Sequence, residues 1–346
     1  MNESVASDAL QSRLGDWREQ ALSLESAVNA AVIGQEHAVR MATVAIFARG
    51  HVLLEGDVGV GKTTLLRCVA RAVGGAYERI EGTVDLMPTD LVYHTYISSD
   101  GKPCVDPGPL LRHSEELVTF FFNEVNRARP QVHSLLLRAM AERSVNGFNR
   151  EYHFPHLQVF ADRNRVEKEE TFELPAAARD RFLMEINIES PADEDLQKAL
   201  MFDVRFHDAD ALVNSVPEAV VPYQQLNSIA EHIQQSIHVA PALQDYALGL
   251  VRALRRPQDY GIELEDVDTS NLVIGGGSPR GMSALMRAAR VHAWLSGRDM
   301  VVPEDLQVLF QELMAHRVFF NPIYEYRRET LAVQLIDAVV KTVAAP

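Results

Sequence analysis

The segment "GDVGVGKT" at residues 56–63 constrains the fold of this chain more than any other stretch of its sequence. It matches the pattern G-x-x-x-x-G-K-[S/T] of phosphate-binding loops, in which glycines let backbone N–H groups surround phosphate oxygens. The apolar segment "HVLLEG" before it predicts a buried strand, and "TTLLRCVARAVG" after it predicts a helix whose positive end faces the same anion. Because the motif needs this strand–loop–helix context, the sequence predicts a nucleoside triphosphate site here.

Lys62 and Thr63 are the loop residues whose side chains carry chemistry. A lysine at this position reaches the β- and γ-phosphates, and the hydroxyl of the next residue is placed to bind Mg²⁺. The predicted nucleotide-binding residues are Gly56, Asp57, Val58, Gly59, Val60, Gly61, Lys62, Thr63 and Thr64.

Further apolar runs predict the fold class. "LVTFFF" (117–122) and "LQVFA" (157–161) are typical of buried strands, each followed by polar loop or helix. Strands that alternate with helices indicate an α/β fold with a parallel sheet and crossover helices. Two hairpins are predicted as insertions, one turning at Asp100-Gly101 and one turning at Asn146-Gly147.

The pattern changes after Pro191, where the remaining periodic segments have helical spacing. We therefore predict an αβα nucleotide-binding domain at residues 1–190, a linker at 191–221 and an all-helical lid domain at 222–346.

Charge and composition narrow the partners and the location. The formal net charge of −15 disfavours nucleic acid as a partner, because such binding draws on clustered Lys and Arg. No stretch approaches the roughly 20 apolar residues of a membrane span, and the N-terminal segment lacks the pattern of a signal peptide. The two cysteines are too few for a disulfide framework. We expect a cytoplasmic protein.

The segment "VTFFFNEVNR" (118–127) raises the question of whether the site hydrolyses its nucleotide. A Walker-B strand ends in an acid that helps to hold Mg²⁺, often followed by a glutamate that polarises the attacking water. Glu124 has the place of that base, whereas Asn123 offers Mg²⁺ a carbonyl oxygen without a charge. Loss of that charge is expected to weaken metal positioning by about 1–3 kcal/mol, so hydrolysis should be attenuated and not abolished.

Motifs along nearly the whole chain resemble the MoxR family of AAA+ ATPases. The matching segments are "VIGQEHAV", "GHVLLEGDVGVGKT", "DLMPTDL", "PGPLL", "NEVNRARPQVHSLLLRAMAERSV", "ELPAAARDRF" and "GGGSPRGMSALMRAARVHAWLSGRD". The resemblance implies a P-loop NTPase core with a β-hairpin in its second helix, a helical lid, and ATP with Mg²⁺ as cofactors. It also implies a ring, expected to be a hexamer.

The resemblance assigns roles to residues outside the loop. Asn164 matches the sensor-1 residue that orients the attacking water. Arg181 matches the arginine finger that reaches a neighbouring subunit's γ-phosphate, with Arg179 as the alternative. Arg280 matches sensor 2 at the start of a lid helix. With Glu124, these residues form the predicted catalytic set, and Thr63 and Asn123 are the predicted Mg²⁺ ligands.

The chain departs from the family pattern at two places. Most relatives have Asp where this chain has Asn123. Relatives also carry a Thr-Gln-Asn-Pro-like segment around sensor 1, which here reads Asp162-Arg163-Asn164-Arg165. The two new arginines, Arg163 and Arg165, could add positive charge near the phosphates or pair with acidic neighbours, and we expect the pairing.

The family resemblance implies an ATP-dependent chaperone that remodels or activates partner proteins. Partners of such proteins carry von Willebrand A domains with a metal-dependent adhesion site, and the leading client hypothesis is maturation or metal loading of methanol dehydrogenase. Two alternatives remain. One is a nucleotide-gated scaffold that hardly hydrolyses ATP because of Asn123, and the other is a nucleic-acid motor.

Overall fold

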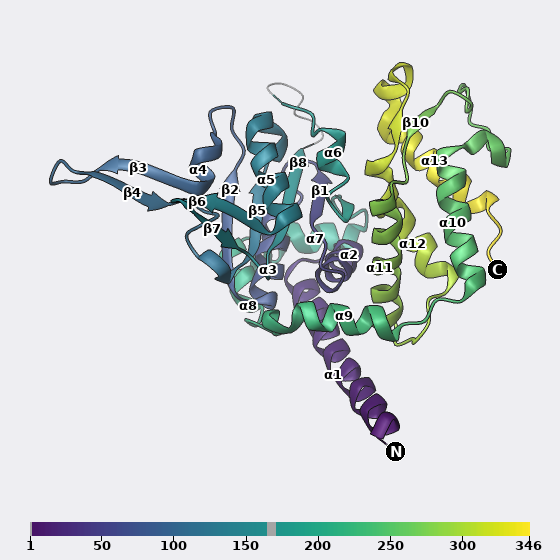
Figure 1. Cartoon of the computed structure of the whole chain (residues 1–346), viewed down its shortest axis with the longest axis horizontal. Helices are drawn as coiled ribbons and strands as arrows, with labels where there is room; N and C mark the ends of the chain where they lie inside the picture. The colour runs from purple at the N-terminus through teal and green to yellow at the C-terminus, as the bar shows by residue number, and fades with distance from the viewer. Residues whose placement is uncertain (1, 165–170) are drawn as a thin grey trace. The chain divides into compact units, whose positions relative to one another are not determined.

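The computed structural model describes residues 2–164 and 171–346, with side chains described from residue 13 onward. The chain divides into two compact units, whose elements are labelled in Figure 1. The first unit comprises Met1–Arg181 and Ile186–Asn227, and the second comprises Phe182–Glu185 and Ser228–Pro346. Within the described ranges, no helix is long and apolar enough to cross a membrane.

A sheet with the strand order β2-β5-β8-β1-β9 forms the centre of the nucleotide-binding fold. Its strands are β1 (Val52–Gly56), β2 (Ala76–Glu81), β5 (Leu117–Asn123), β8 (Gln158–Asn164) and β9 (Met184–Ile188). The β2–β5, β5–β8 and β8–β1 pairs are parallel. All residues of β1 and β5 are buried, as expected for strands covered on both faces. The predicted α/β class is confirmed, and parallel pairing brings the carboxyl ends of β1, β5 and β8 to one edge of the sheet.

The helices of the first unit surround this sheet, and α1, α3 and α8 pack against one another. Their bounds are α1 (Asn2–Ala31), α2 (Glu36–Phe47), α3 (Lys62–Val73), α4 (Pro88–Val92), α5 (Pro130–Glu142), α6 (Ala176–Arg179), α7 (Glu194–Phe202) and α8 (Ala209–Ser215). Residues 191–221, expected as a linker, include α7 and α8 and belong to the first unit. The Arg71 guanidinium of α3 donates to the Val216 carbonyl at 2.7 Å, which ties this segment to the helix after the phosphate-binding loop.

Two antiparallel hairpins are inserted into the first unit. The hairpin of β3 (Tyr93–Ile97) and β4 (Pro103–Pro107) projects away from the sheet (Figure 1). Its predicted turn at Asp100-Gly101 is confirmed, with Gly101 at φ +74° between the two strands.

The second hairpin consists of β6 (Ser144–Gly147) and β7 (Arg150–His153), and its turn differs from the predicted one. Gly147 pairs with Arg150, so the turn residues are Phe148 and Asn149, and the predicted turn at Asn146-Gly147 is wrong. Phe148 and Asn149 have φ values of 50° and 58°, the left-handed pair of a two-residue hairpin turn. A Cβ on Gly147 would lie 2.5 Å from a Leu111 methyl group, so packing and not turning requires glycine there.

The second unit is mostly helical. Its helices are α9 (Leu226–Ser236, of which the first two residues belong to the first unit), α10 (Pro241–Arg255), α11 (Pro279–Leu295), α12 (Pro303–Met314) and α13 (Arg328–Thr342). α11 packs on α12 and α10 packs on α13. A short antiparallel pair, β10 (Val273–Gly275) with β11 (Phe319–Phe320), departs from the expected all-helical lid.

Candidate nucleotide-binding and catalytic site

The phosphate-binding loop joins the end of β1 to the start of α3, as the sequence predicts. Gly61 is the residue before the helix and has φ +90°, a conformation that favours glycine. A Cβ added at Gly59 or at Gly61 would meet nothing within 4 Å, so the space beside the loop is open. Thr63 and Thr64 lie half-buried in the first turn of α3, at the positive end of the helix dipole. The loop therefore has the shape and polarity of an anion cradle.

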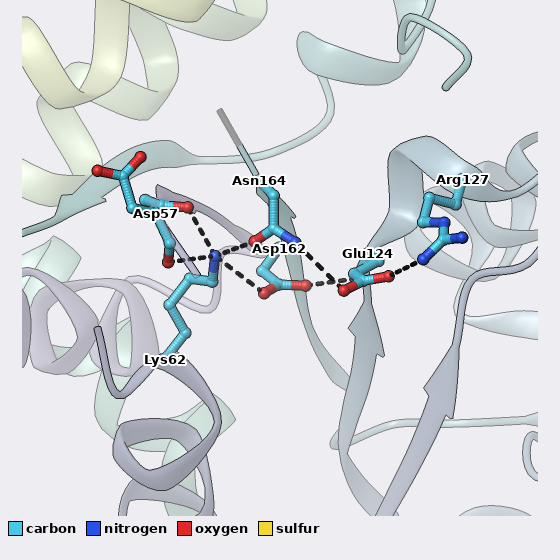
Figure 2. A network of polar contacts seen from close by, with 7 residues as sticks. Asp57, Lys62, Glu124, Arg127, Asp162 and Asn164 are labelled. Carbon is cyan, nitrogen blue, oxygen red and sulfur yellow. Dashed lines mark hydrogen bonds and ion pairs between the residues drawn. The ribbon is translucent and has the colours of Figure 1, made fainter. Parts of the chain in front are cut away.

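Lys62 is buried, and its ammonium group is held by four neighbours at the end of the sheet (Figure 2). It donates to the Gly56 carbonyl at 2.7 Å, to the Asp57 carbonyl at 3.3 Å and to the Asn164 side-chain oxygen at 2.5 Å. Its nitrogen also lies 3.6 Å from a carboxylate oxygen of Asp162. The lysine thus contacts both the loop and β8.

Glu124 follows β5 directly and is connected to the same cluster. Its carboxylate accepts hydrogen bonds from the Asn164 amide at 3.2 Å and from the Arg127 guanidinium at 3.1 Å. Its backbone N–H donates to the Asp162 carboxylate at 2.5 Å. Asn164 therefore bridges Lys62 and Glu124, with its oxygen on one side and its nitrogen on the other (Figure 2).

Asn123, the last residue of β5, is buried beside this cluster. Among the described residues, its side chain makes no hydrogen bond, while its backbone carbonyl accepts from the Gly82 N–H at 2.7 Å. An amide oxygen is a suitable ligand for Mg²⁺ or for its water shell. Asn123 therefore keeps the oxygen ligand of a Walker-B acid but lacks its negative charge.

Gly82 is a residue whose importance the sequence does not reveal. A Cβ at this position would lie 2.1 Å from the backbone oxygen of Glu124. Only a residue without a side chain lets the end of β2 approach the Asn123-Glu124 peptide this closely. No motif marks Gly82, because the approach is between segments that are distant in the chain.

Asp162 on β8 is the second residue that sequence reasoning missed. It is 1% exposed and lies between Lys62 and Glu124 (Figure 2). Burial raises the pKa of its carboxyl group, although the hydrogen bond from the Glu124 N–H and the charge of Lys62 oppose the rise. The feature of the sequence that could have pointed to Asp162 is the departure of residues 162–165 from the family pattern.

Arg163, the next residue on β8, pairs with Glu55 of β1 at 3.2 Å. The expectation that it pairs with an acidic neighbour is confirmed. Arg165, for which we expect the same, lies outside the described residues.

Comparisons with known proteins agree with this geometry. Residues 51–184 match the family described as "ATPase family associated with various cellular activities (AAA)", and residues 268–337 match the AAA lid domain. Protein MoxR of Methylorubrum extorquens is 60% identical over 346 residues, covering all of both chains. The chain belongs to the MoxR family of AAA+ ATPases. The resemblance seen in its motifs is confirmed.

Other relatives extend this comparison. Protein MoxR of Paracoccus denitrificans is 54% identical over 97% of this chain and 99% of its own length. Chaperone MoxR1 of Mycobacterium tuberculosis is 33% identical over 91% of this chain and 79% of its own length. A crystal structure of a protein from Cytophaga hutchinsonii has a TM-score of 0.83 at 27% identity, covering 99% of both chains. These matches confirm the AAA+ fold with its helical lid.

The predicted arginines of this MoxR-family chain belong to both units: Arg179 and Arg181 to the first and Arg280 to the second. Arg181 lies two residues beyond α6, and its guanidinium donates to the Ala177 carbonyl at 2.7 Å. Arg179 ends α6 and is buried. Arg280 is an exposed residue in the first turn of α11, in the second unit. The roles of finger and sensor 2 stay predictions for these residues.

The cluster itself brings together groups with complementary tasks. Lys62 is a cation at the loop, Glu124 is an acceptor that can take a proton from water, and Asn164 fixes the orientation of both. A cation for phosphate and an oriented carboxylate are the protein's parts in phosphoryl transfer to water.

Proposed function

We propose that the chain hydrolyses ATP in a Mg²⁺-dependent reaction and uses this reaction as a MoxR-type chaperone. The observation that carries the proposal is the continuous contact from Lys62 through Asn164 to Glu124. This contact couples the group that senses the γ-phosphate to the group that activates water.

The residues present fit a nucleotide triphosphate with Mg²⁺. The loop is open beside Gly59 and Gly61, and in this structure the Lys62 ammonium donates to carbonyls of its own loop. Phosphate oxygens would replace those carbonyls as acceptors. Thr63 and Asn123 would hold Mg²⁺, which neutralises charge on the β- and γ-phosphates when bound. Glu124 would accept the proton of the attacking water, and Asn164 would hold its carboxylate in place.

The first test is steady-state ATP hydrolysis by the purified full chain over a range of Mg²⁺ concentrations. We expect measurable turnover that falls by about a hundredfold or more in Glu124→Gln, because that change removes the general base. Nucleotide binding should persist in Glu124→Gln and should be lost in Lys62→Ala. Turnover in Glu124→Gln equal to that of the parent would contradict the proposed mechanism.

Asn123→Asp tests whether the neutral residue limits the site. We expect turnover to change little or to fall, because the surrounding cluster already contains Asp162. A large gain would instead mean that the parent site mainly binds and holds ATP.

We further propose that the chain assembles into a hexameric ring in the cytoplasm and acts with a partner bearing a von Willebrand A domain. Its client would be methanol dehydrogenase, whose maturation or metal loading it would support. The 60% identity to Protein MoxR of M. extorquens over the full length supports placing it in this branch. The test is replacement of the chromosomal gene by Glu124→Gln in the source organism. We expect methanol dehydrogenase with reduced activity and metal content, and unchanged enzyme would overturn the client assignment.

A further inference from the structure

Two departures from the usual pattern, Asn123 and Asp162, lie side by side in the sheet. The register of the parallel β5–β8 pair ends with Phe122 opposite Ala161. Asn123 and Asp162 are the next residues on the two strands. Because side chains at matching positions of neighbouring strands point to the same face, both face the same side of the sheet.

Asp162 contacts both parts of the site that surround it. One carboxylate oxygen accepts the backbone N–H of Glu124 at 2.5 Å, and the other lies 3.6 Å from the Lys62 nitrogen. The side chain is almost fully buried. Burial of a carboxylate is costly, and Lys62 and the Glu124 N–H offset part of that cost here.

This geometry explains why the two departures occur together. A carboxylate at position 123 would lie on the same face as Asp162, at the neighbouring strand position, and next to Glu124. Two carboxylates at such neighbouring strand positions would repel each other. The neutral amide of Asn123 avoids that repulsion and still offers an oxygen ligand.

We propose that Asp162 supplies, from β8, the negative charge that a Walker-B acid supplies from the end of β5. Asp162 is a positioning residue: it holds Lys62 and the Glu124 backbone, and it keeps negative charge beside the Mg²⁺ ligands Thr63 and Asn123. This inference rests on the proposed function, since it concerns the same nucleotide site.

The test exchanges the two groups without changing their shapes. The variants are Asp162→Asn, Asn123→Asp and the double variant with both changes, each in a Glu124→Gln background that blocks turnover. The measured quantity is the affinity for a fluorescent ATP analogue as a function of Mg²⁺ concentration. Asp203→Asn makes the same isosteric change at a half-buried acid that pairs with Arg205 outside the site, and it serves as the control.

We expect Asp162→Asn to weaken the Mg²⁺-dependent part of the affinity by about tenfold to a hundredfold, the usual range for groups that support a metal site. Asn123→Asp alone should also weaken it, and the double variant should recover most of the loss. The inference would be overturned if the affinity loss of the double variant equalled the product of the two single-variant losses. It would also be overturned if Asp162→Asn kept the full affinity of its parent.

The Mg²⁺ dependence of the affinity loss and the binding behaviour of the Glu124→Gln parent separate this inference from a purely structural role of Asp162 and from a failure of the proposed function. In Asp162→Asn the amide oxygen can still accept the Glu124 N–H, but Lys62 loses a buried counter-charge, so thermal unfolding without nucleotide should occur at a lower temperature than in the parent. An affinity loss that is independent of Mg²⁺ concentration would assign Asp162 a purely structural role and overturn the inference. If the Glu124→Gln parent itself fails to bind the analogue, the proposed function fails first.

Discussion

Glu124 occupies a backbone conformation that few residues other than glycine adopt, with φ 52° and ψ 48°. Such a conformation costs about 1–3 kcal/mol and persists only where surrounding contacts enforce it. Here the enforcing contacts are the bond from its N–H to Asp162 and the close approach of Gly82 to its carbonyl. The conformation turns the carboxylate towards Asn164 and Arg127, so strain at this residue serves the site.

Gly82→Ala is expected to damage the site from outside it. Its new Cβ would have to move the Glu124 backbone, because the two atoms would otherwise lie 2.1 Å apart. We expect a loss of about 1–3 kcal/mol in unfolding free energy, the usual range for overpacking, together with a strong loss of ATP turnover.

Gly15→Ala is the matched control for that substitution, because a Cβ at Gly15 meets nothing within 4 Å inside α1. It should raise stability slightly, by up to about 1 kcal/mol, and leave turnover unchanged. The measurements are denaturant unfolding and ATP hydrolysis of the parent, Gly82→Ala and Gly15→Ala. Normal turnover in Gly82→Ala would show that Glu124 does not depend on this approach.

At the scale of single elements, the second unit depends on a charged cluster between α11 and α12. Asp305 is fully buried and accepts hydrogen bonds from Arg298 at 2.6 Å, from His292 at 2.6 Å and from the Val302 N–H at 2.8 Å. Burial alone would raise the pKa of Asp305, but these hydrogen bonds outweigh it and the pKa is lowered. The carboxylate therefore fixes the start of α12 against the end of α11.

Asp305→Asn should lower the unfolding free energy of the second unit by about 3 kcal/mol at pH 7, because it leaves the Arg298 guanidinium without its counter-charge. A carboxyl whose pKa is lowered on folding contributes stability above its unfolded pKa of about 4, and that contribution is lost as the pH falls through the folded pKa. The difference between parent and variant should therefore shrink below about pH 4. Hydrogen exchange of α11 and α12 amides measures it, and an equal difference at every pH would contradict this account.

At the scale of the whole molecule, a site that needs an arginine from a neighbouring subunit can be tested by mixing inactive chains. In Arg181→Ala the residues around Lys62 are intact, and in Glu124→Gln the arginine is intact. If Arg181 acts on a neighbour, a mixed ring contains interfaces with both groups, about a quarter of them in an equal random mixture.

We therefore expect Arg181→Ala and Glu124→Gln to be inactive separately. Their mixture should recover up to about a quarter of the parent's turnover. The measurement is ATP hydrolysis after co-assembly, with oligomer size followed by light scattering. Arg179→Ala in place of Arg181→Ala tests the alternative finger. An absence of recovery in co-assembled rings would mean that Arg181 does not act across the interface.

The central strands of the sheet were predicted, and its edge strands were not. β1, β5 and β8 are covered on both faces, so their sequences are continuous apolar runs that a local reading detects. β2 ("AYERIE") and β9 ("MEINI") lie at the two edges, where polar and apolar residues mix. The turn of the β6–β7 hairpin was predicted wrongly, because Gly147 is required by its close packing against Leu111 and not by the turn.

The phosphate-binding loop, the position of Glu124 directly after a buried strand, the parallel α/β class and the family could all be read from the sequence, because each depends on residues that are neighbours in the chain. Only the tertiary structure decided that Asp162 lies between Lys62 and Glu124. That placement depends on the strand order, in which β8 lies between β5 and β1. Strand order is set by packing between segments that can lie more than a hundred residues apart, as the paired β1 and β8 do, and local patterns contain no record of it. The same packing brings Asn123 and Asp162, two separate departures from the family pattern in the sequence, to neighbouring positions in the sheet.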